Sequence, residues 1–232
     1  MNTTEHERNP ALEHRLFELI RNDEEIIELI KLANEHLGVI GFTEHGIRHA
    51  SIVARWSGSI LSTLGYPDEE VELARVAGFL HDIGNFICRT DHGQTGASIL
   101  YVMLKRFPFT TRQLGKVLSA VGNHEEQYGQ CFNETCAAVV LADKADVHRS
   151  RVRAYDPANH DIHDDVNYAV TRSDLIVDPD LREIRLDLDI DGETASMMDF
   201  FEIFMSRMVM CKSSAAYLGC TFKISCNGTV VS

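Results

Sequence analysis

The pattern of hydrophobic and polar positions predicts a mostly helical chain. Between residues 44 and 149, hydrophobic residues recur every three or four positions, which is the repeat of a helix with one buried face. Asp23 is placed to cap one helix, and Thr110 with Gln113 forms the capping-box pattern at the start of another. The expected helices cover residues 10–21, 23–37, 44–64, 68–81, 92–106, 110–124 and 134–149 or beyond.

From about residue 176 onward the pattern changes to that of a small α+β element. Hydrophobic and charged residues alternate over 183–191, and again over 222–226, as in half-buried strands. Asn227-Gly228 then predicts a hairpin turn. Between the strands, a helical stripe is expected to pack into the core; it consists of Met197, Phe201, Phe204, Met208 and Cys211.

The fold class expected from these patterns is mainly α, a helical bundle followed by short antiparallel strands and one helix. We divide the chain into an N-terminal tail with two helices (1–42), a central helical domain (43–175) and the C-terminal element (176–232). The weakly patterned segment 154–173 is expected to be loop with some helix, including a solvated loop at 161–165.

Composition and charge narrow the classes of function. The chain has 22 Lys and Arg against 35 Asp and Glu, a net charge of −13, and no basic run, which argues against binding of polymeric nucleic acid. No stretch approaches the roughly 18 hydrophobic residues of a membrane span, and the N-terminus is polar, so we expect a cytoplasmic protein. The six cysteines form no C-x-x-C pair and are expected to be reduced.

Polar residues interrupt the hydrophobic faces of several expected helices. One histidine on such a face is usually a hydrogen-bonded core residue, but several together favour a metal site. Four imidazoles and two carboxylates suit a divalent transition metal, with iron or manganese favoured and nickel, cobalt or zinc also compatible. The candidate metal ligands are His49, His81, Asp82, His92, His124 and Asp143.

The order of His49, the His81-Asp82 pair and Asp143 resembles the H…HD…D signature of the HD-domain superfamily of metal-dependent phosphohydrolases. The strings FLHDIGN (79–85), HGQTGASIL (92–100), NHEE (123–126) and LADKAD (141–146) carry this resemblance, which covers about residues 43–153. It implies a helical bundle around a metal held by these four residues. Members with two ions have additional histidines in the positions of His92 and His124, which implies a dinuclear site bridged by Asp82.

The match to the two-metal signalling phosphodiesterases named for HD plus a GYP motif is incomplete. Gly65-Tyr66-Pro67 precedes the His-Asp pair, where that family has no such motif, and Asn85 replaces the Lys that usually follows HDIG. The chain is more similar to small bacterial HD hydrolases that act on nucleotides or dinucleoside polyphosphates. The expected substrate is therefore a small phosphorylated molecule, a nucleotide or dinucleotide.

The expected reaction is hydrolysis of a phosphate ester by a metal-activated water. Asp82 and Glu125 are the predicted catalytic residues, with Glu125 orienting a ligand or shuttling a proton, or alternatively lying on the surface. Lys144, Arg149 and Arg151 are predicted to follow Asp143 on one continuous helix and to bind substrate phosphate; the alternative is a solvated basic face.

Two other functions remain open at this point. The bundle could bind metal and nucleotide without turnover, as a sensor or interaction module, or it could be a structural protein with a satisfied polar core. The presence of all six ligand positions favours the enzyme. The C-terminal hairpin, if exposed, would also allow a homodimer.

Overall fold

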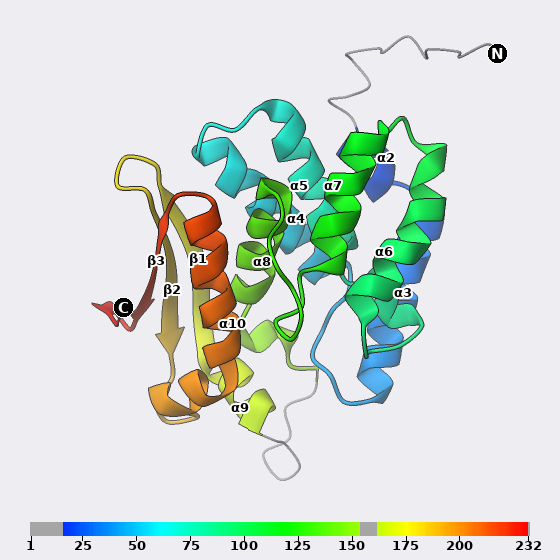
Figure 1. Cartoon of the computed structure of the whole chain (residues 1–232). Coiled ribbons are helices and arrows are strands. Elements are labelled where there is room, and N and C mark those ends of the chain that lie inside the picture. The colour runs from blue at the N-terminus through cyan, green and yellow to red at the C-terminus, as the bar shows by residue number, and fades with distance from the viewer. Residues whose placement is uncertain (1–15, 154–161, 232) are drawn as a thin grey trace, which may run out of the picture.

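The computed structural model of the chain describes residues 16–153 and 162–231. In this part, helices α2 to α8 pack into a bundle, and the C-terminal strands lie together on one side of it with α10 (Figure 1). The bundle helices are α2 (Leu16–Arg21), α3 (Glu24–Val39), α4 (Ile47–Thr63), α5 (Asp68–Leu80), α6 (His92–Met103), α7 (Thr111–Gly122) and α8 (Glu134–Ala145). Short 3-10 turns cover Ile83–Phe86, Leu104–Arg106 and Arg149–Arg151.

The two helix caps expected from the sequence are present, whereas the helix expected from residue 44 begins at Ile47. The Asp23 side chain accepts a hydrogen bond from the backbone N–H of Ile26 (3.1 Å), and Thr110 and Gln113 form the reciprocal capping box. Helix α3 continues to Val39, two residues past its expected end. The first expected helix lies partly outside the described residues, which begin within it at Leu16.

Helix α8 is the central helix of the bundle. Residues 135–142 are all buried, and the helix packs against α4, α5, α7 and α10. A helix that is hydrophobic around its whole circumference has to be enclosed, and its alanines at 137, 138 and 142 let neighbouring helices approach closely. This packing carries the C-terminal end of α8, with Asp143, into the interior.

The C-terminal element forms a four-stranded sheet in the order β1-β2-β3-β4. The antiparallel pairing expected from the sequence holds for β1 with β2 and for β3 with β4, while β2 and β3 are parallel because helix α10 returns the chain to the same end of the sheet. Asn227 (φ 49°) and Gly228 (φ 79°) make the expected hairpin turn, with both residues left-handed. The elements are β1 (Val170–Asp178), β2 (Glu183–Ile190), α10 (Met197–Tyr217), β3 (Thr221–Cys226) and β4 (Thr229–Val230).

The segment expected to be mostly loop is more regular than its sequence indicated. Helix α9 covers Ile162–Ala169, including most of the expected solvated loop at 161–165, and β1 follows it directly; residues 154–161 lie outside the described part. A bulge near Val170 disturbs the alternating pattern expected of a strand in β1. Pairing with β2 holds the rest of this strand in a regular register. The domain boundary expected at residue 175 falls inside β1. The whole of this strand pairs with β2 of the C-terminal element.

The inner face of the sheet and helix α10 share a hydrophobic core, in which Phe204, Met208 and Cys211 of the expected stripe are buried. Phe200, which was not in that stripe, is also buried, whereas Phe201 is half-buried. Met197, expected in the same stripe, is 38% exposed because it begins the helix. The outer face carries ion pairs such as Arg172 with Asp189.

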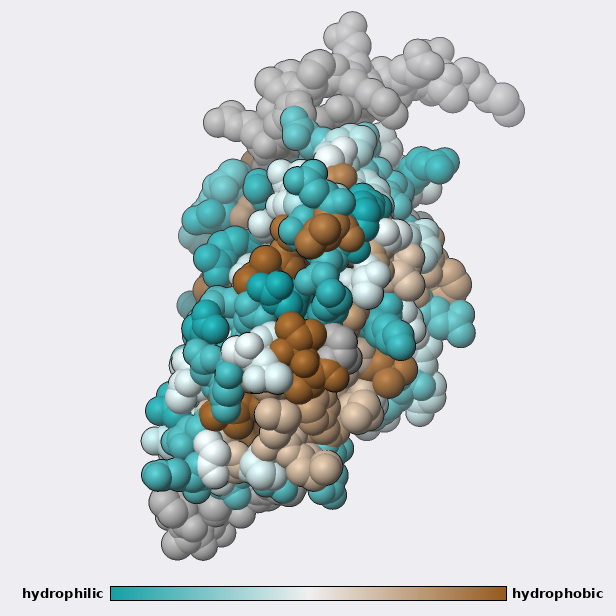
Figure 2. Space-filling model, turned by 90° about the vertical axis from the view of Figure 1, so that its left-hand side faces the viewer, coloured by the Kyte–Doolittle hydropathy of each residue, from teal (hydrophilic) through white to brown (hydrophobic). Residues whose placement is uncertain are grey.

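Figure 2 shows the side of the molecule on which the sheet lies, with hydrophilic side chains over most of it and a smaller hydrophobic area across its middle and lower part. None of the described helices is long and hydrophobic enough to span a membrane.

Candidate metal centre

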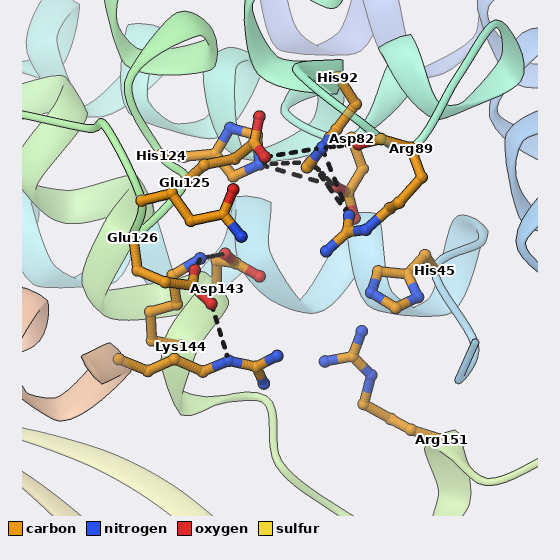
Figure 3. Close-up of a pocket in the computed structure, with 12 residues that line it drawn as sticks. His45, Asp82, Arg89, His92, His124, Glu125, Glu126, Asp143, Lys144 and Arg151 are labelled. Atoms are coloured by element: carbon orange, nitrogen blue, oxygen red, sulfur yellow. Dashed lines mark hydrogen bonds and ion pairs between the residues drawn. The ribbon is translucent and has the colours of Figure 1, made fainter. Parts of the chain in front are cut away.

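The six predicted ligands come together inside the bundle, although they are distributed over 95 positions of the chain, from 49 to 143. Each lies at or near the end of a helix. His49 is in the first turn of α4, His81 and Asp82 directly follow α5, and His92 begins α6. His124 lies just after α7, and Asp143 is near the end of α8. Figure 3 shows several of them around one pocket.

Glycine at position 84 allows two of these helix ends to meet. A Cβ atom on Gly84 would collide with the carbonyl group of His92 and lie 2.6 Å from the backbone nitrogen of Gly96. The turn after Asp82 therefore packs directly against the first turn of α6 because residue 84 has no side chain. This contact brings Asp82 and His92 within reach of each other.

Asp82 lies between two groups of ligands. Its Oδ2 atom is 3.3 Å from His81 Nε2 and 3.6 Å from His49 Nε2. Its Oδ1 atom is 3.0 Å from His92 Nε2 and 3.6 Å from His124 Nε2. The two oxygens of one carboxylate thus face two different pairs of imidazoles.

Asp143 completes the first of these groups. Its Oδ1 atom is 3.3 Å from His49 Nε2 and 3.5 Å from His81 Nε2. The arrangement places two histidines and Asp143 on one side of Asp82, and two histidines on the other.

All four imidazoles are held in the same manner. Each Nδ1 atom lies within hydrogen-bond distance of an oxygen that can only accept, so Nδ1 carries a proton and Nε2 is the nitrogen that a metal would bind. The Nε2 atoms are those that converge on the centre. The Nδ1 partners are Asp146 Oδ2 for His49 (2.7 Å), and the backbone oxygens of Gly78 for His81 (2.8 Å), Arg89 for His92 (3.1 Å) and Val121 for His124 (2.7 Å).

This arrangement fits a bound cation. His49 Nε2 is 3.2 Å from His81 Nε2, and His92 Nε2 is 3.0 Å from His124 Nε2, so lone pairs face one another unless a positive charge lies between them. Asp82 Oδ2 is buried and has no hydrogen-bond donor among the described residues. A buried carboxylate oxygen without a donor is costly, and metal coordination would satisfy it.

The pKa values describe a site in which the carboxylates are ionised. Burial alone would raise the pKa of Asp82, but His81 and the other imidazoles outweigh it and hold the pKa well below its usual value. Lys144 and the histidines likewise outweigh burial at Asp143 and hold its pKa well below the usual value. Burial lowers the pKa of His124 to about 4, whereas Asp82 and Asp143 overcome burial at His81 and raise its pKa to about 10. Metal binding would therefore displace a proton from His81.

Asp146 is a functional residue that the sequence reasoning missed. Besides accepting the proton of His49 Nδ1, its carboxylate lies 3.2 Å from Arg48 Nη1 and 3.8 Å from Arg151 Nε. Such outer partners fix the orientation and raise the basicity of a histidine ligand. Its position one helical turn after Asp143, within the string LADKAD, was the signal available in the sequence.

Glu125 lies at the centre and is not a free surface residue. Its Oε2 atom is 3.2 Å from His92 Nδ1, and its Oε1 atom accepts the backbone N–H of Gly93 (2.9 Å). Burial opposes its ionisation, but His92 lowers its pKa to about 2. A carboxylate that stays ionised and contacts a ligand imidazole is suited to orienting that ligand, which is one of the two roles expected for it.

The continuous helix predicted from Glu134 to Arg149 or beyond is wrong. Helix α8 ends at Ala145, where Asp146 is the C-cap residue with non-helical backbone angles (φ −79°, ψ 68°). Lys144 still lines the pocket, buried between Asp143 Oδ2 (2.6 Å) and Glu126 Oε2 (3.1 Å).

Arg151 also reaches the pocket, through a separate 3-10 turn. Arg149 does not: its guanidinium stacks on Tyr168 and lies 4.0 Å from Asp191.

Four further residues of the pocket were missed as functional residues or given no firm role: His45, Arg89, Glu126 and Arg207. His45 lies just before α4, with its ring centre 5.4 Å from that of His49. Arg207 comes from α10, far along the chain, and no local pattern connects it to the HD strings. Burial opposes ionisation of Glu126, yet Lys144 and Arg207 lower its pKa to about 2. Glu126 thus links α10 to the candidate metal ligand Asp143 through Lys144.

The comparison with protein families agrees with this geometry. The family model of the HD domain matches residues 44–148, which contain all six ligands. The chain contains an HD domain. HD domains are typical of metal-dependent phosphohydrolases, and the resemblance described from the sequence is confirmed at this level. A search of curated proteins gives no match.

Proposed function

We propose that this HD domain hydrolyses a phosphate ester of a small nucleotide or dinucleotide at a dinuclear metal site. The observation that carries the proposal is the position of Asp82, whose two oxygens face separate histidine pairs. One carboxylate between two sets of nitrogen ligands is suited to bridge two ions. The ligand chemistry favours iron or manganese, with nickel, cobalt and zinc also compatible.

The residues around the centre have distinct roles in this proposal. Two bound ions would supply an activated water and neutralise charge on the phosphoryl oxygens. Asp82 would hold both ions, Glu125 would keep the His92 ring in place, and Lys144 would position Asp143. Arg151, whose guanidinium faces the pocket, would bind a phosphate oxygen of the substrate.

The test combines metal analysis with a substrate screen. The protein is purified, loaded with manganese or iron, and its metal content is measured by mass spectrometry. It is then assayed on p-nitrophenyl phosphate, bis-p-nitrophenyl phosphate, nucleotides and dinucleotides. We expect two ions per chain and hydrolysis of at least one phosphate ester.

Asp82→Asn is the decisive variant, because the amide removes the charge and one of the two ligand oxygens. It should lose metal and activity together, whereas Asp187→Asn on the outer face of the sheet should retain both. A protein without stoichiometric metal that hydrolyses none of these compounds would contradict the proposal. Metal and tight nucleotide binding without turnover would instead support the sensor function.

A further inference from the structure

A second pocket adjoins the metal pocket on its open side. The two pockets share four lining residues, which are His45, Arg89, Arg151 and Arg207. Four of the candidate metal ligands line the first pocket and none lines the second, so these four shared residues mark the boundary between a metal-binding part and an outer part. In Figure 3, Arg89, His45 and Arg151 reach into the metal pocket from the same side.

The boundary is positively charged in a protein whose net charge is −13. Among the described residues, Arg89 forms no ion pair with a carboxylate; its Nη1 is 3.4 Å from Asn85 Oδ1 and 3.3 Å from His92 Nε2. Among the same described residues, Arg207 pairs with one carboxylate, Glu126, with 3.4 Å between Arg207 Nε and Glu126 Oε1. The guanidinium groups therefore retain donors for an anionic ligand.

Arg151 provides an independent observation at the same place. Its side chain is almost completely buried, with a relative exposure of 5% for the residue, and two of its nitrogens bind backbone oxygens of Glu44 (3.1 Å) and Asp146 (2.7 Å). Its third nitrogen, Nη2, is buried and has no partner within the described residues. A buried guanidinium donor is costly to leave unsatisfied, and a phosphate oxygen would satisfy it.

The outer pocket also offers hydrophobic and aromatic surface. Phe42 lies under the Arg89 guanidinium (5.0 Å from its carbon to the ring centre), and Phe204 lies under Arg207 (4.6 Å). Ile40 and Phe42, at the edge of this pocket, are 56% and 38% exposed. Exposed hydrophobic residues next to fixed cations are suited to a ligand that combines a planar ring with phosphate groups.

The geometry points to a bipartite substrate site, in which Arg89, Arg151 and Arg207 bind a second, non-scissile phosphate and the outer pocket with the exposed residues Ile40 and Phe42 holds a nucleoside. The substrate class is therefore a nucleotide with at least two linked phosphates, not a simple monophosphate ester. This inference rests on the proposed function, since the scissile phosphate is assigned to the metal centre.

The inference is tested by calorimetry with three probes on the metal-loaded protein. Adenosine 5′-(α,β-methylene)diphosphate contains a nucleoside and two phosphoryl groups joined by a methylene group. Methylenediphosphonate lacks the nucleoside, and adenosine monophosphate lacks the second phosphate. We expect the first probe to bind at least about tenfold more tightly than either of the others, as the loss of a charge-assisted contact or of ring stacking implies.

Variants then separate the two parts of the site. Arg207→Gln should weaken binding of adenosine 5′-(α,β-methylene)diphosphate about tenfold. Phe42→Ala should weaken binding of the same probe about tenfold but leave binding of methylenediphosphonate, which has no nucleoside, unchanged. Arg172→Gln and Phe132→Ala are the matched controls on the surface and should bind as the wild type does. Arg151→Lys is a second test of the anion subsite that keeps the charge of a buried residue but removes the Nη2 donor.

Equal binding of the three probes by the wild-type protein, or unchanged binding in Arg207→Gln and Arg151→Lys, would overturn the inference. Metal analysis and hydrolysis of p-nitrophenyl phosphate on the same samples distinguish this failure from failure of the proposed function. A metal-loaded, active protein without arginine-dependent binding refutes only the bipartite site. A protein without metal and activity refutes the proposed function.

Discussion

Asp146 contacts the candidate metal ligand His49, which makes this carboxylate a sharp test of the proposed centre. In Asp146→Asn the negative charge 2.7 Å from His49 Nδ1 is lost, and the Arg48 ion pair at 3.2 Å is lost with it. Removing an outer partner of a histidine ligand typically lowers metal affinity about 10- to 100-fold, or about 1.4 to 2.8 kcal/mol. Because the amide oxygen of Asn can still accept the imidazole proton, we expect about tenfold.

The assay is titration of the metal-free protein with manganese or zinc in competition with a chromophoric chelator. The effect should concern the ion on the His49 side of Asp82, so one of two binding events should weaken and the other should remain. Asp174→Asn, an exposed carboxylate on β1 paired with Arg172, is the matched control. Wild-type affinity at both positions in Asp146→Asn would refute the assigned role of this hydrogen bond.

Three further predictions concern the fold around the centre. Gly84→Ala forces the turn after Asp82 away from α6, so we expect loss of metal and a lower melting temperature, measured by mass spectrometry and calorimetry. Glu126 has its pKa lowered to about 2, so its contribution to stability is present above about pH 4.5 and is lost as the pH falls toward 2. In Glu126→Gln, the free energy of unfolding measured in urea should therefore fall less steeply as the pH is lowered. The loss between about pH 4.5 and 2 should be smaller than in the wild type by about 2 kcal/mol after allowance for solvent screening. Phe200→Ala should lower the free energy of unfolding by about 3 to 5 kcal/mol, because this ring is fully buried between the sheet and the bundle.

Each of these changes has a counterpart at a position where the same chemistry should matter little. Gly115→Ala, on an exposed part of α7 with open space around it, should stabilise the helix slightly. Glu193→Gln and Phe132→Ala alter exposed side chains. If a control variant changes metal content or stability as much as its partner, the structural reason given for that partner is wrong.

The clustering of the six candidate metal ligands could be predicted from the sequence because they interrupt hydrophobic faces of helices. An imidazole or carboxylate at such a position is conspicuous against the 3.6-residue repeat, and the HD strings supplied their order. The same reasoning failed where tertiary packing decides the structure. Helix α8 ends at Ala145, and β1 forms a strand by pairing with β2; both outcomes depend on neighbours that are distant in sequence.

Residues that approach the site from remote elements were equally inaccessible to pattern reading. Arg207 lies on α10, whose hydrophobic stripe predicts only core packing, and its role follows only from the proximity of α10 to α8. Phe42 lies in an irregular loop where periodicity carries no information. The ring-binding part of the proposed site could therefore not have been derived from the sequence.

The position of the ligands at the ends of five different helices has a thermodynamic consequence. An ion bound at this centre would act as a cross-link between segments that the unfolded chain cannot hold together, so binding energy becomes folding energy. At a free metal concentration one hundred times the dissociation constant, this linkage adds about 2.7 kcal/mol per site to the folded state. Metal supply would then set the resistance of each copy to proteolysis as well as its activity, and chelation would shorten the lifetime of the protein itself.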